Sequence, residues 1–181
     1  VPAAVLITRD REARQLEGNR ACHDLLRLPP GANRSHVTPL GKFPQNCRAM
    51  RGGRELAPED LPVQVAARGG VLVDGSEFEL RFADGVTRHL LGNAAPLLDP
   101  AGTPAGAVGV FLDVTETRAL EQSLAASEER LSVALDAAKA GTWEWDLETD
   151  AHRWSPRLWQ LYGLDPGRIT PCHEAWLETI A

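Results

Sequence analysis

Residues 115–140 constrain the fold more than any other part of the chain, because this run contains neither Gly nor Pro. It is rich in Ala, Leu, Glu and Arg, which favour helix. An apolar, β-branched stretch at 107–112 precedes it. The pattern predicts a strand that passes directly into a long helix. Asp113 or Thr115 can provide the side-chain oxygen that caps the first free amides of that helix.

Heptad counting along this helix predicts an apolar line, here called the helix seam, which consists of Leu120, Leu124, Leu131 and Leu135. Small or polar residues interrupt the line at Thr117, Ser127 and Ala134. A seam of this kind suits a modest two-stranded coiled coil, or a helix that packs on its own domain. The first alternative predicts a homodimer through the helix.

Composition excludes several classes of protein. The chain has 181 residues and a formal net charge of −6, so a nucleic-acid-binding surface is not expected. No apolar run is long enough to span a membrane and no signal peptide is visible, so we expect no membrane contact by this segment. Three cysteines make no disulfide framework, which favours a reducing, cytoplasmic location. The first residue is Val, and we expect a longer parent protein.

The first part of the chain predicts an α+β fold. Asn19 can cap a short helix, and Pro62 can open another that ends at Gly69. A small hairpin is expected over 47–56, turning at Gly52 and Gly53. Together the signals predict a five-stranded antiparallel sheet with short helices on one face, with strands at 3–8, 14–16, 77–82, 87–95 and 107–112.

The order of signals repeats after the long helix. A shift of 136 residues places Ser155 on Asn19, and it places the turn after Leu164 on the turn after Leu28. Both copies read as strand, polar turn, short strand and capped helix. The second copy therefore predicts a related module, which the sequence given carries only in its first third.

Several of these stretches resemble the PAS sensory domain family. Residues 18–29 and the strand that ends in Asp113-Val114-Thr115-Glu116 are the most similar to it. Residues 141–146 read Gly-x-Trp-x-Trp-Asp, which is similar to the opening of one PAS subgroup. The resemblance implies a PAS fold over 1–115, a signalling helix over 116–140 and the N-terminal part of a second PAS domain over 141–181.

The resemblance also implies a function. Tandem PAS domains are typical of bacterial sensor histidine kinases, so we expect a non-catalytic sensory and relay segment upstream of an output domain in the same chain. A cyclic-di-nucleotide cyclase output is the alternative, and a dimerisation scaffold without ligand is another. Asp113, Thr115 and Glu116 are the expected relay residues. A small-molecule ligand is compatible with this interpretation.

Cofactor and metal signals are weak by comparison. Asn46-Cys47-Arg48 matches the tripeptide of the flavin-binding PAS subgroup, in which the cysteine attacks the flavin. Here it lies much farther beyond the first helix and is followed by Ala-Met-Arg rather than Phe-Leu-Gln, so an accidental match is the alternative. No metal site is expected, because the five histidines are scattered. No tightly bound cofactor is expected, and no catalytic residue is expected either, because nothing in the sequence brings a cysteine and a histidine together as nucleophile and base. The five tryptophans all lie in 141–181, as an aromatic core or as a partner or ligand surface.

Overall fold

The structure is a computed structural model that describes residues 2–28 and 47–180. The chain divides into two compact units, Val1–Ala119 and Leu120–Ala181. Each unit is described by itself below.

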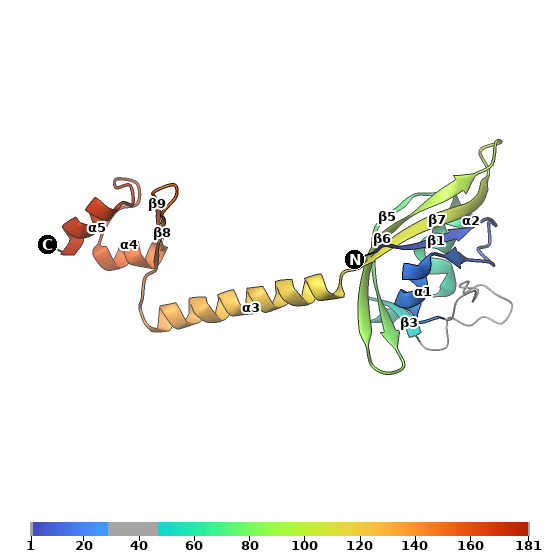
Figure 1. Ribbon diagram of the computed structural model, residues 1–181, viewed down its shortest axis with the longest axis horizontal. Helices are drawn as coiled ribbons and strands as arrows, with labels where there is room; N and C mark the ends of the chain where they lie inside the picture. Colours follow the sequence, from blue (N-terminus) through green and yellow to red (C-terminus); the bar gives the residue numbers. More distant parts are fainter. Residues whose placement is uncertain (1, 29–46, 181) are drawn as a thin grey trace. The chain divides into compact units, whose positions relative to one another are not determined.

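The first unit is built on one antiparallel sheet (Figure 1). Among the described residues the strand order is β2-β1-β7-β6-β5-β3-β4. The strands are β1 (Ala4–Thr8), β2 (Glu17–Gly18), β3 (Cys47–Arg51), β4 (Arg54–Glu55), β5 (Val73–Phe82), β6 (Thr87–Leu98) and β7 (Pro104–Asp113). The α+β class with an antiparallel sheet and short helices is thereby confirmed.

The predicted count of five strands is wrong, because the described part of the sheet has seven. The two additional strands form the hairpin over 47–56, which joins the main sheet through β3, where Cys47 pairs with Phe82. Local turn signals predict such a hairpin but do not reveal its long-range partner. The strand expected at 14–16 lies instead at Glu17–Gly18 and pairs with Leu6 and Ile7.

Two helices cover one face of this sheet: α1 (Arg20–Leu26) and α2 (Pro62–Gly69), the latter preceded by the 3-10 turn η1 (Pro58–Asp60). The Asn19 side chain accepts a hydrogen bond from the Cys22 amide and so caps α1, as predicted. Alternate residues of β5 face the helices: Phe78 and Leu80 are buried, whereas Glu77 and Arg81 are exposed. The core of the unit therefore lies between the sheet and these two helices.

Gly109 in β7 lets α2 approach the sheet closely. A Cβ atom at this position would lie 2.6 Å from Val63 Cγ2 and 2.8 Å from Phe111 Cε2. We expect Gly109→Ala to lower the free energy of unfolding by about 2 kcal/mol, because both neighbours are buried and cannot easily move. Urea unfolding followed by circular dichroism measures this change. Val110→Ala, at an exposed neighbouring position, is the control, and an equal loss in both variants would contradict the packing argument.

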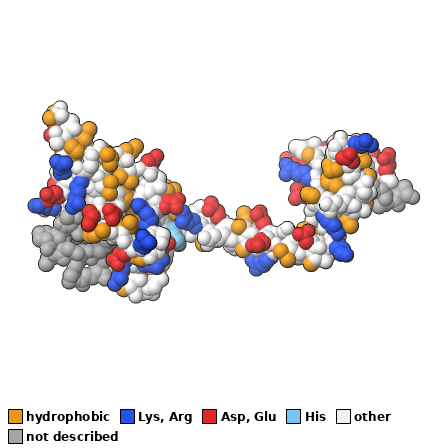
Figure 2. Space-filling model, turned by 180° about the vertical axis from the view of Figure 1, so that it is seen from behind, with side chains coloured by type: hydrophobic (Ala, Val, Ile, Leu, Met, Phe, Trp, Pro, Cys, Tyr) orange, Lys and Arg blue, Asp and Glu red, His pale blue; other side chains and the backbone are white. Residues whose placement is uncertain are grey.

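The helix α3 (Thr115–Ala137) follows β7 after one residue. None of its residues is buried. Hydrophobic side chains lie at intervals along it between charged ones (Figure 2). The exposed fractions of Leu120, Leu124 and Leu131 are 65%, 61% and 60%, and Leu135 is half-buried.

The second unit contains the hairpin of β8 (Trp143–Asp146) and β9 (Ala151–Trp154), followed by α4 (Pro156–Tyr162) and α5 (His173–Ile180). Trp154, Leu158 and Trp159 form its small buried core. Most of the other described residues of this unit are exposed, and they include Trp143 and Trp145.

The capped helices of the two units share a local geometry. The amide of Asn19 donates to the Val5 carbonyl, and the Val5 amide donates back to the Asn19 side chain. Ser155 exchanges the same two bonds with Thr142 and accepts from the Leu158 amide, as Asn19 accepts from the Cys22 amide. The helices α1 and α4 have the same length of seven residues.

Candidate functional site: the strand-to-helix junction and the adjacent cavity

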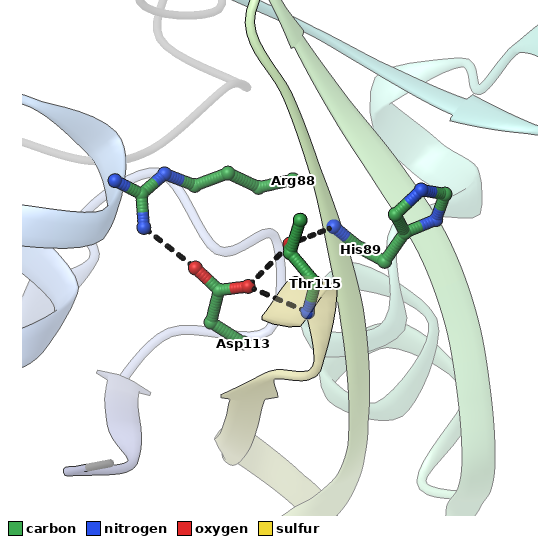
Figure 3. A network of polar contacts seen from close by, with 4 residues as sticks. All are labelled: Arg88, His89, Asp113 and Thr115. Atoms are coloured by element: carbon green, nitrogen blue, oxygen red, sulfur yellow. Dashed lines mark hydrogen bonds and ion pairs between the residues drawn. The ribbon is translucent and has the colours of Figure 1, made fainter. Parts of the chain in front are cut away.

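Four residues tie the start of α3 to the sheet, and together they are called the junction network: Arg88, His89, Asp113 and Thr115 (Figure 3). Asp113 Oδ1 accepts hydrogen bonds from the Thr115 amide at 3.0 Å and from Thr115 Oγ1 at 2.5 Å. Asp113 Oδ2 lies 2.5 Å from Arg88 Nη1. The His89 amide of β6 donates to Thr115 Oγ1 at 2.8 Å. The last residue of β7 and the first residue of α3 are therefore both held by β6.

The Asp113 carboxylate is the charge at the centre of this network. Its side chain is only 17% exposed. Burial acts to raise the pKa of Asp113, but the hydrogen bonds from Thr115 and the Arg88 guanidinium outweigh this effect and lower the pKa below its ordinary value of 3.8. The junction network is therefore built around an ionised carboxylate at neutral pH.

The lowered pKa of Asp113 predicts a specific loss of stability in acid. A carboxyl group with a lower pKa in the folded state contributes stability above its unfolded pKa, and this contribution disappears as the pH falls through the folded pKa. We therefore expect the urea midpoint of the wild type to fall more steeply below about pH 4 than that of Asp113→Asn. Parallel curves for the two proteins between neutral pH and acid would contradict this assignment.

A second contact ties α3 to the sheet beside the junction network. Arg118 Nη2 in the first turn of α3 lies 2.5 Å from Glu77 Oε2 of β5. Sequence reasoning missed Arg118, because Glu77 is 41 residues away in the chain. Glu116 is exposed in the first turn of α3. A negative charge at this end of a helix interacts favourably with the helix dipole.

A cavity of about 50 Å³ lies inside the first unit, between the helices and the sheet. Its walls include Leu25 of α1, Val63 and Gln64 of α2, Leu80 of β5 and Phe111 of β7. Gln64 is the polar exception in an otherwise apolar wall: it is 1% exposed, and its Nε2 atom has no hydrogen-bond partner among the described residues. Sequence reasoning missed Gln64, because nothing in a helical pattern marks a single inward-facing amide.

The cavity and the junction network share a wall. A second hollow of about 170 Å³ is lined by Arg88 and Asp113, and also by three residues that line the first cavity: Ala4, Leu25 and Phe111. Phe111 packs edge-on against Phe78, with ring centroids 5.6 Å apart, and precedes Asp113 by two residues in β7. A displacement of Phe111 by an occupant of the cavity would therefore act directly on the strand that ends at Asp113.

Cys47, the candidate from the flavin interpretation, does not line this cavity. It is buried at the start of β3, and burial raises the pKa of its thiol to about 12, against a smaller opposing effect of the Arg27 charge. A thiol with this pKa stays protonated at neutral pH and is a poor nucleophile. Asn46 and the segment before it lie outside the described residues.

A further hollow lies in the second unit. In the second unit, Trp143, Trp145, Trp154, Trp176 and three neighbours line a space of about 150 Å³. Across the described ranges, no group of three or more His, Cys, Asp or Glu side chains could hold a metal ion. No helix in the described part of the chain is long and apolar enough to cross a membrane.

Comparison with known proteins assigns the first unit to a family. A family model described as PAS fold matches residues 1–119. The chain belongs to this family, and its first unit is a PAS sensory domain of the kind found in signal-transduction proteins. The resemblance of residues 1–115 to the PAS family is thereby confirmed.

The relatives are much longer than this chain. The two-component sensor PprA of Pseudomonas aeruginosa is 40% identical over 86 residues, 46% of this chain and 9% of that protein. A protein of Escherichia coli named "Probable diguanylate cyclase DgcE" is 32% identical over 79 residues, 44% of this chain and 7% of that protein. The non-motile and phage-resistance protein of Caulobacter vibrioides is 26% identical over 163 residues, 80% of this chain and 19% of that protein.

One solved structure similar to this chain is a sensory box histidine kinase/response regulator from Burkholderia thailandensis. It is 17% identical, with a TM-score of 0.40, over 72% of this chain and 90% of that chain.

Proposed function

We propose that this chain is a non-catalytic sensory and relay segment, in which the first unit detects a signal and α3 carries the response to an output domain of the same protein. The observation that carries the proposal is the junction network. Asp113 and Thr115 connect the last strand of the sensor to the first turn of the helix, and both are bonded to β6. A shift of the sheet therefore changes how α3 begins.

The helix seam supports a homodimer as the form that transmits the response. Most of the stability of a helix in a protein comes from packing of its apolar face on another element, and none of the residues of α3 is buried in the single chain. Leu120, Leu124 and Leu131 are exposed in the single chain, so they are available to a second copy of the helix. Interruption of the seam at Ser127 and Ala134 weakens the pairing. A weak seam lets two arrangements of similar free energy exchange.

We further propose that 141–181 begin a second PAS domain. The matched capping bonds of Asn19 and Ser155 and the equal lengths of α1 and α4 support this interpretation. The relay helix would then connect two sensory modules in series.

For the output domain, we propose a histidine kinase as the first candidate, because a two-component sensor is among the relatives with the highest identity. A diguanylate cyclase is the second candidate, and the Escherichia coli relative supports it. Sequencing onward from Ala181 in the parent gene separates the two: a phosphoacceptor histidine helix with an ATP-binding domain supports the first, and a cyclase domain supports the second.

The relay role of the junction network is tested in the parent protein. We expect Thr115→Val to reduce the response of the output activity to its signal at least about fivefold, because a coupling free energy of 1 kcal/mol corresponds to this factor. Thr103→Val, at an exposed threonine in the turn between β6 and β7, is the control, because it makes the same change away from the network and the helix seam. An unchanged signal response in Thr115→Val would refute the relay role.

A further inference from the structure

The cavity of the first unit has one feature that its packing does not explain. Most of its wall consists of apolar side chains such as Leu25, Leu80, Leu90 and Phe111, yet Gln64 also lines it. Burial of an amide N–H without a partner costs free energy comparable to a lost hydrogen bond. A leucine of similar size would fill this position without that cost.

A capping role in α2 does not explain why a glutamine stands at position 64. It is the third residue of the helix, where a glutamine commonly turns back to the amide of the N-cap residue. Here the N-cap amide, that of Leu61, already donates to the Pro58 carbonyl, and the Gln64 side chain lies in the cavity instead. The buried amide is therefore free to bind a molecule in the cavity.

The charge of the wall limits what this molecule can be. Among the described residues that line the cavity there is no Arg, Lys, His, Asp or Glu. A charged ligand group would be buried without a counter-ion, which is very unfavourable. A neutral ligand with an oxygen acceptor meets both conditions, because its oxygen can accept from Gln64 Nε2 and its remaining atoms can contact the apolar wall.

The volume of the cavity limits the size of the molecule that it can bind. A cavity of about 50 Å³ has room for about four groups of the size of a water molecule. Water alone satisfies the site poorly, since a buried water needs two to four polar partners and this wall offers essentially one side chain.

We propose that the cavity binds a small neutral carbonyl or hydroxyl compound of about four non-hydrogen atoms, whose oxygen accepts a hydrogen bond from Gln64 Nε2. This inference rests on the proposed sensory function, for which it names the class of ligand. Gln64 is the specificity-determining residue, and the apolar wall selects for a short hydrocarbon part. Binding would press on Phe111, which also borders the hollow beside Asp113.

The test uses acetone as the polar probe and xenon as the apolar probe, with methyl NMR on the 181-residue chain. We expect saturable shifts of the Leu25, Leu80 and Leu90 methyl groups with both probes in the wild type. In Gln64→Leu, acetone binding should weaken at least about tenfold, whereas xenon binding persists. Gln15→Leu, which changes an exposed glutamine in the same unit, should bind both probes as the wild type does.

The other outcomes separate the proposed ligand class from the proposed sensing role of the cavity. If xenon binds but acetone does not, or if acetone binds equally to Gln64→Leu, the proposed ligand class is wrong while the cavity remains a candidate sensing site. If neither probe binds to the wild type, the cavity is closed to ligands. The ligand-sensing part of the proposed function then fails with the inference. A Gln64→Leu protein that has lost its methyl dispersion is replaced by Gln64→Met, for which the same tenfold loss of acetone binding is expected.

Discussion

Leu124→Glu combined with Leu131→Glu is expected to convert the proposed homodimer into a monomer. Burial of one leucine side chain contributes about 1.5–3 kcal/mol, and the two substitutions remove four such side chains from the paired helices. Carboxylates at the same positions would also repel one another across the seam. We therefore expect the dissociation constant to rise at least about 100-fold, since 1.4 kcal/mol corresponds to a factor of ten.

Light scattering coupled to size-exclusion chromatography over a range of protein concentrations measures this change. Ala125→Glu combined with Ser132→Glu is the matched control, because it adds the same charge to the same helix away from the seam. A wild-type chain that stays monomeric at every concentration would contradict the paired-helix arrangement. An equal loss of dimer in both variants would show that charge, not the seam, controls association.

Asp113→Ala is expected to destabilise the first unit at its junction with α3. The substitution removes the acceptor of three hydrogen bonds and leaves the Arg88 guanidinium without its carboxylate. Hydrogen bonds to a charged group each contribute about 1.5–3 kcal/mol in favourable cases, and partial solvent access at Arg88 reduces the sum. We expect a loss of about 2 kcal/mol in the free energy that protects the β6 and β7 amides from hydrogen exchange.

Asp84→Ala is the control for this experiment. Asp84 also lies 2.5 Å from an arginine, Arg27, but more than half of its side chain is exposed. Exposed ion pairs contribute little to stability, so the protection of the same amides should stay close to that of the wild type. Equal losses in the two variants would mean that Asp113 acts as an ordinary surface charge.

Local signals in the sequence predicted the individual elements well. Asn19 and Ser155 cap their helices, and α2 runs from Pro62 to Gly69, because each signal acts within one turn of the chain. The strand-to-helix junction at Asp113 and Thr115 was also predicted, since an apolar run meets a helical run there. Whether these two residues relay a signal stays a prediction.

Long-range contacts were not predictable in the same way. The pairing of β3 with β5 depends on residues 35 positions apart in the chain, such as Cys47 and Phe82, and no local pattern specifies it. Arg88 and Gln64 were missed for a related reason. Their importance comes from what lies beside them in the folded unit, namely Asp113 for one and an apolar cavity for the other.

We infer that a change at the cavity reaches α3 through the junction network. A double-mutant cycle between Gln64→Leu and Asp113→Ala tests it most directly, with hydrogen exchange of the Arg118 amide as the readout. This amide donates to the Val114 carbonyl and forms the first turn of α3. We expect the two effects to differ from additivity by more than about 0.5 kcal/mol, the limit for independent sites. Additive effects within that limit would contradict the claim.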